Sequence, residues 1–243
     1  MRVRIRFTKA GKVRFLSHRD LARIWERAMR RAELPVTYSV GFSPRPKLHF
    51  GLALSVGHES MAEYLDVDLV SALTDADFAL LPARLSEVMP EGIDCTAAAE
   101  PPAGESRSLQ EAVSSVTWSF LLEGGDADAA RSAAGALLAS PCVMVERDRK
   151  SKTHHDDIRP YVLDLRLVQD ETEAEHHPRL LAELATQPRG LRPGELIAAL
   201  GTNWQELRVC RLAQWIDQPD GSRVEPLALP AVGVAAAAGV GAR

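Results

Sequence analysis

The sequence has few cysteines and no long apolar run. Cys95, Cys142 and Cys210 are odd in number and far apart, which argues against a disulfide framework and suits a reducing cytoplasm. The basic start, MRVRIRFTK, alternates with apolar residues and no apolar run follows it, unlike a signal peptide. The C-terminal stretch PAVGVAAAAGVGAR, residues 230–243, is too short and too rich in glycine to cross a bilayer. We therefore expect a folded cytoplasmic protein, not held in a membrane, with a disordered tail at 229–243.

Common signatures of catalytic sites are also absent, since no Walker loop, GxGxxG, GxSxG or HExxH occurs. Two histidine-containing segments resemble metal ligands at first sight. The residues in each are adjacent rather than spaced along one helical face, and adjacent side chains rarely ligate one ion together. We therefore expect no cofactor in this chain, and no metal at His154, His155, Asp156 and Asp157 or at His176 and His177.

Charge is distributed unevenly along the chain. Residues 1–50 hold thirteen Lys and Arg against three acids, a net charge of +10. The remaining residues hold sixteen Lys and Arg against 30 acids, a net charge of −14. This asymmetry indicates an anionic partner for the first part of the chain.

Hydrophobic periodicity in residues 1–98 predicts the order strand, helix, strand, strand, helix, strand. Residues 2–7 alternate between arginine and apolar side chains, as in a half-buried strand. A helix follows, with Ser17 and Asp20 as its capping pair and Pro35 as its stop. Its apolar stripe comprises Leu21, Ile24, Trp25, Ala28, Met29 and Ala32. The later elements are strands at 48–54 and 63–69, a helix capped by Thr74 or Asp75, and a short strand around Cys95.

This order is the split βαβ arrangement of ferredoxin-like domains, in which both helices cover one sheet face and the other stays open. After a linker-like segment, AEPPAGES, the order recurs without residue-level repetition. Its expected elements are strands at 116–122, 142–147, 159–168 and 206–216, with helices at 126–139 and 192–200. We therefore predict an α+β protein of two tandem ferredoxin-like (βαββαβ) units with antiparallel sheets. The predicted boundaries are a basic N-terminal domain at 1–98, a linker at 99–110 and a C-terminal domain at 111–228.

The polar face of the first helix is strongly basic. Arginines spaced by four, four and three residues form a continuous ridge opposite the apolar stripe. This arginine ridge consists of Arg19, Arg23, Arg27 and Arg30, with Arg31 beside it. Guanidinium groups bind phosphate in a bidentate way and release its counterions. The same pattern also fits a solvated helix face on which Glu26 pairs with Arg30.

A stiff basic loop, GFSPRPK at 41–47, follows this helix. Its glycine permits a left-handed backbone, and its two prolines restrict φ and remove amide donors. Arg45 and Lys47 are thus expected to be held outward near the end of the ridge, with His49 on the open sheet face. The ridge, Arg45, Lys47 and His49 together form the predicted anion-binding surface.

Other cations and the histidines carry less weight. Arg2, Arg4 and Arg6 face the same side as two aspartates of the strand at 63–69, so cross-strand pairs should cancel much of their charge. A histidine with a lysine can act as an acid–base pair on RNA, which makes His18, His49 and Lys47 the catalytic candidates. The helix places His18 roughly 18 Å from the loop, so we do not expect a direct His18–His49 pair.

Several phrases resemble a known family. FLSHRDL (15–21), LP (34–35), GFSPRPK (41–47), GHES (57–60) and the later DIRPY (157–161) are similar to phrases of the DUF2344 family of radical-SAM-linked proteins. In that family the module is free-standing or fused after a radical SAM domain, and its genes often lie near those for ribonuclease E/G and ribosomal proteins. The resemblance therefore implies a role connected with RNA or translation.

A radical SAM enzyme needs three closely spaced cysteines for its iron–sulfur cluster, and this chain has none so arranged. The resemblance therefore implies that this chain is the accessory protein of a separate radical SAM protein. That partner carries the 4Fe-4S cluster and S-adenosylmethionine. Our leading hypothesis is a non-catalytic accessory protein that binds tRNA, rRNA or another anionic substrate. The alternatives are a metal-independent endoribonuclease resembling CRISPR RNA-processing nucleases, and a protein–protein scaffold whose ridge meets an acidic partner.

Overall fold

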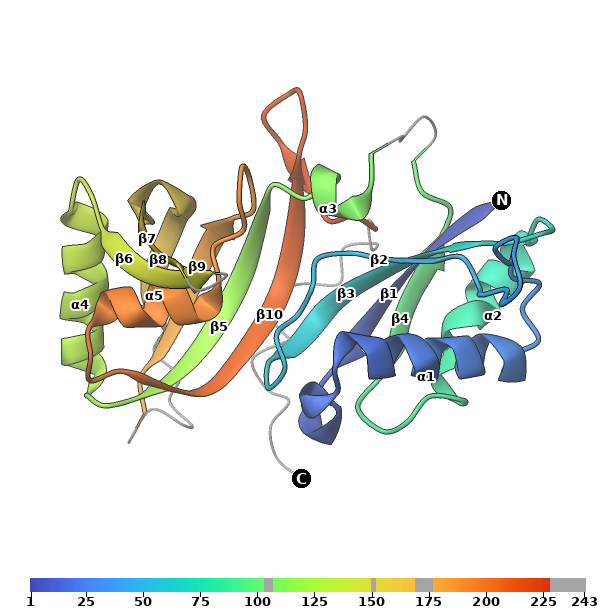
Figure 1. The fold of residues 1–243 in the computed structure, drawn as a ribbon, viewed down its shortest axis with the longest axis horizontal. Coiled ribbons are helices and arrows are strands. Elements are labelled where there is room, and N and C mark those ends of the chain that lie inside the picture. The colour runs from blue at the N-terminus through green and yellow to red at the C-terminus, as the bar shows by residue number, and fades with distance from the viewer. Residues whose placement is uncertain (103–106, 150–151, 169–176, 228–243) are drawn as a thin grey trace.

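A computed structural model of the chain describes residues 1–102, 107–149, 152–168 and 177–227. In these ranges a nine-stranded sheet contains the path β4-β1-β3-β10-β5-β9-β8, with helices packed against it (Figure 1). Neighbouring strands on this path are antiparallel, except that β3 and β10 are parallel. The protein is therefore α+β, with a mostly antiparallel sheet.

The N-terminal half has the element order expected from its sequence. Its strands lie side by side as β4-β1-β3-β2, and each is antiparallel to its neighbour. The elements are β1 (Arg2–Lys9), a 3-10 turn (Gly11–Phe15), α1 (His18–Arg31), β2 (Leu48–Phe50), β3 (Glu59–Asp68), α2 (Asp75–Ser86) and β4 (Cys95–Ala99). The strand expected at 48–54 is therefore shorter than predicted.

Both helices of this half begin at the predicted caps. The Ser17 hydroxyl accepts a hydrogen bond from the Asp20 amide at 3.2 Å, and Thr74 forms a capping box with Asp77. The apolar stripe of α1 then faces the sheet, where the Trp25 ring meets the Phe7 ring edge-on at 4.9 Å. Because this stripe is buried, the opposite, basic face of α1 is exposed to solvent.

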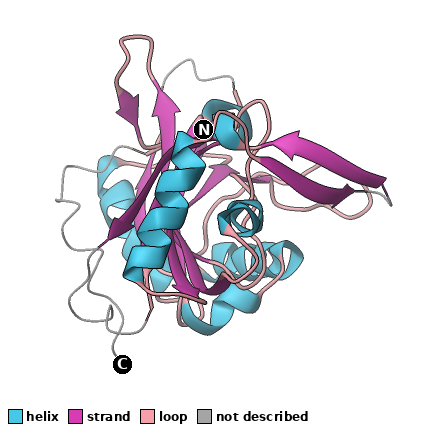
Figure 2. Cartoon of the chain, turned by 90° about the vertical axis from the view of Figure 1, so that its left-hand side faces the viewer, coloured by secondary structure: helices cyan, strands magenta, loops and turns pink. Residues whose placement is uncertain are grey.

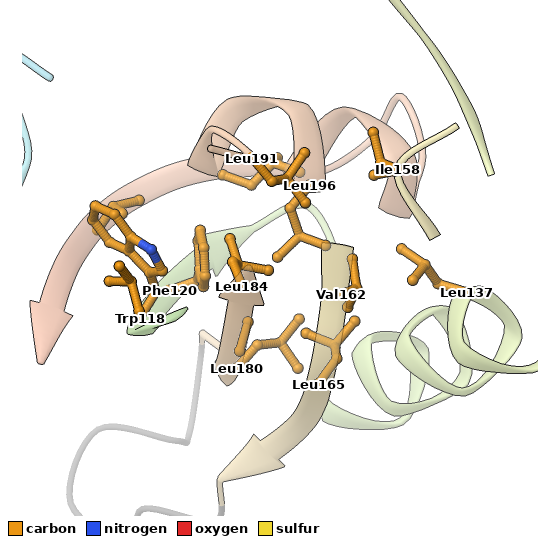
Figure 3. Close-up of a cluster of buried hydrophobic side chains, with 14 of the residues drawn as sticks. Trp118, Phe120, Leu137, Ile158, Val162, Leu165, Leu180, Leu184, Leu191 and Leu196 are labelled. Atoms are coloured by element: carbon orange, nitrogen blue, oxygen red, sulfur yellow. The ribbon is translucent and has the colours of Figure 1, made fainter. Parts of the chain in front are cut away.

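The C-terminal half has the order β10-β5-β9-β8, again with antiparallel neighbours. Its elements are β5 (Ser115–Glu123), α4 (Ala127–Ala139), β8 (Val162–Val168), β9 (Arg179–Ala185), α5 (Pro193–Leu200), β10 (Gln205–Asp217) and the short β11 (Arg223–Val224), with a 3-10 turn at Arg159–Tyr161. Side chains from β5, β8, β9, α4 and α5 converge in one apolar core (Figure 3). Labelled members are Trp118, Phe120, Leu137, Ile158, Val162, Leu165, Leu180, Leu184, Leu191 and Leu196.

One strand of this half was assigned wrongly from the sequence. The strand expected at 142–147 is not in the main sheet. It is β6 (Met144–Arg149), which pairs with β7 (Lys152–Asp157) in a separate hairpin that projects from the body (Figure 2). Every residue from 146 to 157 is polar, so this segment has little to bury. Its place in the sheet belongs to β9, whose buried residues Leu180, Ala182 and Leu184 alternate along the strand.

The two halves share one sheet, which corrects the expectation of two sheets. The parallel pairing of β10 with β3 matches Cys210 with Glu59 and Arg211 with Ser60. This pairing satisfies backbone groups that two separate sheets would leave at exposed edges. The segment after β2 also joins the halves, because Phe50 packs on the N-terminal core whereas Leu52 and Leu54 pack on the C-terminal core.

The sheet face opposite α1 and α2, expected to be open, is largely covered. A short helix, α3 (Leu109–Ala112), and residues 225–227 lie on it, and both Leu109 and Leu227 are buried there against Tyr64. The predicted linker therefore ends in a folded segment. The predicted tail at 229–243 and His176 lie outside the described residues. Of the helices in the described ranges, none combines the length and apolar composition that a membrane crossing requires.

Candidate nucleic-acid interface

The arginine ridge runs along the outer face of α1. Arg19, Arg23, Arg27, Arg30 and Arg31 are all exposed, while the stripe behind them is buried. Arg23 lies 3.5 Å from the Asp20 carboxylate, and Arg30 and Arg31 donate to backbone carbonyls, those of Glu26 and Val88. Arg30 therefore bonds the backbone of Glu26 and not its carboxylate, which differs from the side-chain pair of the alternative interpretation. From Arg19 to Arg30 the ridge extends roughly 16 Å along the helix axis.

The basic loop, residues 41–47, follows the end of α1 after residues 32–40. It is closed at its base by hydrogen bonds from the Ser39 amide to the Arg45 carbonyl at 2.8 Å and from the Lys47 amide to the Thr37 carbonyl at 2.9 Å. The Arg45 amide also donates to the Ser39 hydroxyl at 3.0 Å. Both Arg45 and Lys47 are exposed, so the loop presents its two cations outward from a hydrogen-bonded base.

The cations of β1 do not add to this surface. Arg4 and Asp66 form a bidentate ion pair, with hydrogen bonds of 2.8 and 3.0 Å, and both side chains are buried. Arg2 pairs with Asp68 at 2.8 Å, and Arg6 lies 3.5 Å from Glu225. The predicted cross-strand pairing is therefore confirmed. Most of the exposed arginines of this half thus lie on α1 and the loop after it rather than on β1.

A shallow hollow of about 510 Å³ lies beside these pairs, lined in part by Arg2, Asp68 and Glu100. Its arginine is already bonded to Asp68, and Glu100 adds a second carboxylate. Because the Met1 ammonium and Arg2 are balanced by these two carboxylates, the hollow offers no excess positive charge to an anion.

Two of the three catalytic candidates lie on opposite faces of the sheet. The His18 ring packs edge-on against the Phe50 ring at 4.9 Å on the helix-covered side of the sheet. The neighbouring His49 points to the opposite side, where its Nε2 lies 3.4 Å from an Asp68 oxygen. Lys47 precedes β2 and is exposed. His18 and His49 thus lie on opposite faces of the sheet, and no common substrate atom can contact both.

Comparison with known proteins adds a family and a coarse structural likeness. A family model described as "Uncharacterized protein conserved in bacteria (DUF2344)" matches residues 2–193. The chain belongs to the DUF2344 family. No curated protein matches it. Among solved structures, a chain of a Cbf5–Nop10–Gar1 complex aligns at 10% identity with a TM-score of 0.48, over 87% of this chain and 48% of that one. The DUF2344 chain thus spans about half the length of that protein.

The DIRPY phrase of this DUF2344 protein has a structural role. The Asp157 carboxylate accepts hydrogen bonds from the amides of Val143 and Arg159, at 2.8 and 3.0 Å. These two amide bonds are the main reason that the pKa of Asp157 is lowered. The Arg159 guanidinium donates to the carbonyls of Leu138 and Val162, at 3.1 and 2.8 Å. Arg159 therefore fastens the end of α4 to the start of β8 rather than facing an anion.

The neighbouring histidines and aspartates lie on β7. The Asp156 carboxylate forms ion pairs with Arg147 at 3.0 Å and with Arg189 at 3.5 Å, while His155 is 3.8 Å from Glu146. Arg147 and Arg189 also reach Glu195 at the start of α5, at 3.8 and 3.0 Å. Asp156 and Glu195 are thus paired with two arginines, and these pairs hold the hairpin to α5.

A buried polar cluster at the junction of β3 and β10 was not predicted from the sequence. Arg211 and Glu63 form a buried pair at 2.8 Å, and the Arg211 guanidinium also donates to the carbonyls of Leu52 and Ala53. Its guanidinium carbon lies 4.9 Å from the centre of the Trp118 ring. The visible signal was the pair Glu59 and Glu63, two acidic residues near the start of β3 in addition to the aspartates that pair with β1.

Two ionisable groups beside this pair have shifted pKa values. Burial alone would raise the pKa of Glu59, but the hydrogen bonds from Arg208 at 2.6 Å and from the Gly11 amide at 2.9 Å hold that pKa below its ordinary value. Burial lowers the pKa of Lys9, whose ammonium donates to the carbonyls of Arg14 and Leu16. The enclosed space beside Lys9 and Glu63 has a volume of about 10 Å³, room for one water molecule. The cluster therefore joins the two halves rather than binding a ligand.

The cysteines of this DUF2344 protein occupy three separate places, in β4, before β6 and in β10. Burial raises the pKa of Cys95 and of Cys210 to about 12 in each case. Both thiols are therefore protonated at neutral pH, a state that neither attacks electrophiles nor ligates metals.

Proposed function

We propose that this DUF2344 protein is a non-catalytic accessory module that binds RNA through the arginine ridge and the basic loop. The observation that carries the proposal is the solvent exposure of every ridge residue on one face of α1. Arg23 pairs with Asp20, and among the described residues neither Arg19 nor Arg27 has a carboxylate partner. Guanidinium groups in this state are available to phosphates.

The shape of the surface favours a polymer over a small anion. The ridge is a row of side chains along one helix rather than a concave pocket, so no single small anion can contact all of its members. A phosphodiester chain presents one charge per nucleotide and can follow such a row. The segregation of charge supports the same choice. Residues 1–50 carry +10 in a chain whose net charge is −4, and an excess of +7 remains once Arg2, Arg4 and Arg6 are paired with carboxylates beyond residue 50.

The architecture is compatible with this role. We infer from the strand orders β4-β1-β3-β2 and β10-β5-β9-β8 that each half is a ferredoxin-like unit, the second with β6 and β7 inserted. Sheets of this kind often bind RNA on their open face. Here α3 and residues 225–227 cover that face in the N-terminal unit, so the helix side takes its place as the proposed interface.

The proposal includes a separate radical SAM protein in the cytoplasm as the catalytic partner. It rests on the family phrases and on the spacing of Cys95, Cys142 and Cys210, which does not match a cluster motif. In this arrangement the partner holds the 4Fe-4S cluster and S-adenosylmethionine, and the DUF2344 protein holds tRNA or rRNA. Affinity purification of the tagged protein from its native cells, with and without nuclease, tests the partner. A radical SAM protein retained after nuclease supports a direct contact, and loss of every partner argues for an RNA bridge.

Fluorescence anisotropy with labelled tRNA and rRNA fragments at several salt concentrations tests RNA binding. The variant Arg19→Gln, Arg23→Gln, Arg27→Gln removes three ridge charges. Its matched control, Arg131→Gln, Arg166→Gln, Arg192→Gln, removes three exposed charges from the C-terminal half. The ridge variant should bind more weakly and reduce the slope of log K against log salt by about 2, since each lost contact with a single strand reduces it by about 0.7.

The control variant should behave like the native protein, because equal charge is lost away from the interface. If both variants weaken binding equally, attraction by the ridge is not specific. If the native protein binds no RNA at low salt, the proposal is wrong. Cleavage of the labelled RNA by the pure protein would instead favour the endoribonuclease hypothesis.

A further inference from the structure

The tip of the basic loop carries two apolar side chains with no cover. Val40 and Phe42 have relative exposures of 104% and 110%, the two highest among the exposed large apolar residues of the described ranges. Between them, Gly41 has φ of +147°, a backbone conformation that favours glycine. The glycine therefore lets the chain reverse while both neighbouring side chains point outward.

The loop holds this tip in place. Below the tip, Tyr38 forms an isolated bridge with Pro46, and the bonds joining Ser39 to Arg45 and Thr37 to Lys47 close the base. Pro44 and Pro46 restrict the backbone on one side of the tip. A ring presented on a closed, proline-stiffened loop loses little conformational entropy when it binds.

The surroundings of the Phe42 ring define its partner. Arg45 and Lys47 follow it on the same loop, and Arg30 and Arg31 end the helix that leads into the loop. An exposed aromatic ring with cations on the same loop is an arrangement with which proteins hold single-stranded nucleic acid, where bases stack on rings and cations bind phosphates. In a duplex, both faces of each base are already stacked, so a protruding ring has access only to unpaired bases.

We propose that Phe42 stacks on an unpaired base, so that this surface selects single-stranded RNA over duplex RNA. The inference rests on the proposed function and names its substrate class. The ridge supplies charge attraction that is similar for both forms of RNA, and the loop tip supplies the discrimination between them.

The test compares a labelled 12-nucleotide single strand of uridylate with a 12-base-pair RNA duplex, using anisotropy at fixed salt. Phe42→Leu removes the aromatic ring and keeps an apolar side chain. Phe15→Leu is the matched control, because Phe15 is also exposed, at 61%, but the Arg14 guanidinium lies over its ring at 4.7 Å and the residue precedes the other end of α1. Phe42→Leu should weaken single-strand binding about tenfold and leave duplex binding within twofold. It should also leave the salt slope unchanged, whereas the ridge variant reduces it.

The outcomes separate the inference from the proposed function. If Phe42→Leu binds the single strand as tightly as the native protein while the ridge variant loses affinity, stacking is overturned and RNA binding stands. If Phe42→Leu instead loses a co-purifying protein with RNA binding unchanged, the ring is a protein contact and the inference is overturned. If the native protein binds neither RNA, both proposals fail. Circular dichroism and a urea unfolding curve for each variant verify that it is folded.

Discussion

Arg211 of β10 lies 2.8 Å from the carboxylate of Glu63 in β3, and the exposed fractions of these residues are 2% and 7%. These strands belong to different halves of the chain, and their pairing is the parallel junction that makes one sheet of two. The same guanidinium holds the carbonyls of Leu52 and Ala53, in the segment that packs on both cores. One arginine thus binds β3, β10 and this segment together.

Replacing one member of this pair should be costly. Glu63→Gln leaves the Arg211 charge buried without a carboxylate, and we expect a loss of about 3 to 5 kcal/mol in the free energy of unfolding. Arg211→Met should cost at least as much, because it also leaves two buried carbonyls without a donor. Urea unfolding followed by circular dichroism measures both.

The exposed pair Arg166–Asp164, at 2.8 Å, is the control, and Arg166→Gln should change stability by less than about 1 kcal/mol. The double variant Glu63→Leu, Arg211→Met should lose less than the sum of the single losses. Additive losses would show that the two side chains act independently.

Stability should fall in acid as Glu59 takes up a proton. Its pKa is lower in the folded protein than in the unfolded chain, so its contribution is full above the unfolded value of about 4.3 and is lost as pH falls through the folded value. The free energy of unfolding of the native protein should therefore decline more steeply below about pH 4.5 than that of Glu59→Gln. Titration of the Glu59 carboxyl carbon by NMR gives the folded pKa directly, and an ordinary value there would contradict this prediction.

Two glycines should respond in opposite ways to alanine. At Gly124, φ is +117° and an added Cβ would lie 1.9 Å from the Asn203 carbonyl oxygen, so Gly124→Ala should be strongly destabilising. Gly135 lies within α4 with no atom within 4 Å of an added Cβ, so Gly135→Ala should raise stability by about 0.5 to 1 kcal/mol. Thermal unfolding of both variants checks the pair, and equal shifts would contradict it.

The cap of α1 should contribute measurably to stability. Ser17→Ala removes the acceptor for the Asp20 amide, and we expect a loss of about 1 kcal/mol. Ser43→Ala, in the exposed loop, is the control and should change stability little. Urea unfolding distinguishes the two, and Ser17→Thr should restore most of the lost stability because it keeps a hydroxyl. An unchanged Ser17→Ala protein would mean that this end of the helix is held by packing alone.

Local patterns predicted the elements of the N-terminal half well. The alternation of Val3, Ile5 and Phe7 and the spacing of Leu21, Trp25 and Met29 each specify one buried face, and all six residues are buried. The strand at 142–147 was misplaced because a short apolar start does not distinguish a sheet strand from an isolated hairpin. The alternation of Leu180, Ala182 and Leu184 in β9 was a usable signal, but it follows an acidic loop and was not assigned to a strand.

The candidate interface was also largely predictable. Arginines at spacings of three and four on an amphipathic helix must face away from its buried stripe, so exposure of the ridge follows from periodicity. Exposure of Phe42 was not predictable in this way, because an aromatic residue in a loop can pack inward or project outward. The pairing of Arg4 with Asp66 followed from strand order and alternation together.

By itself, the sequence determined the helices of the N-terminal half, the basic face of α1 and the membership of the DUF2344 family, because each depends on residues close together in the chain. Only the tertiary structure decided that the two halves share one sheet, that the face expected to be open is covered, and that Arg211 reaches Glu63. Those features join residues as much as 222 positions apart, as in the bond from Arg4 to the Pro226 carbonyl. Such contacts depend on which strand edges and apolar faces meet once the chain has folded, and local periodicity does not specify which of them meet.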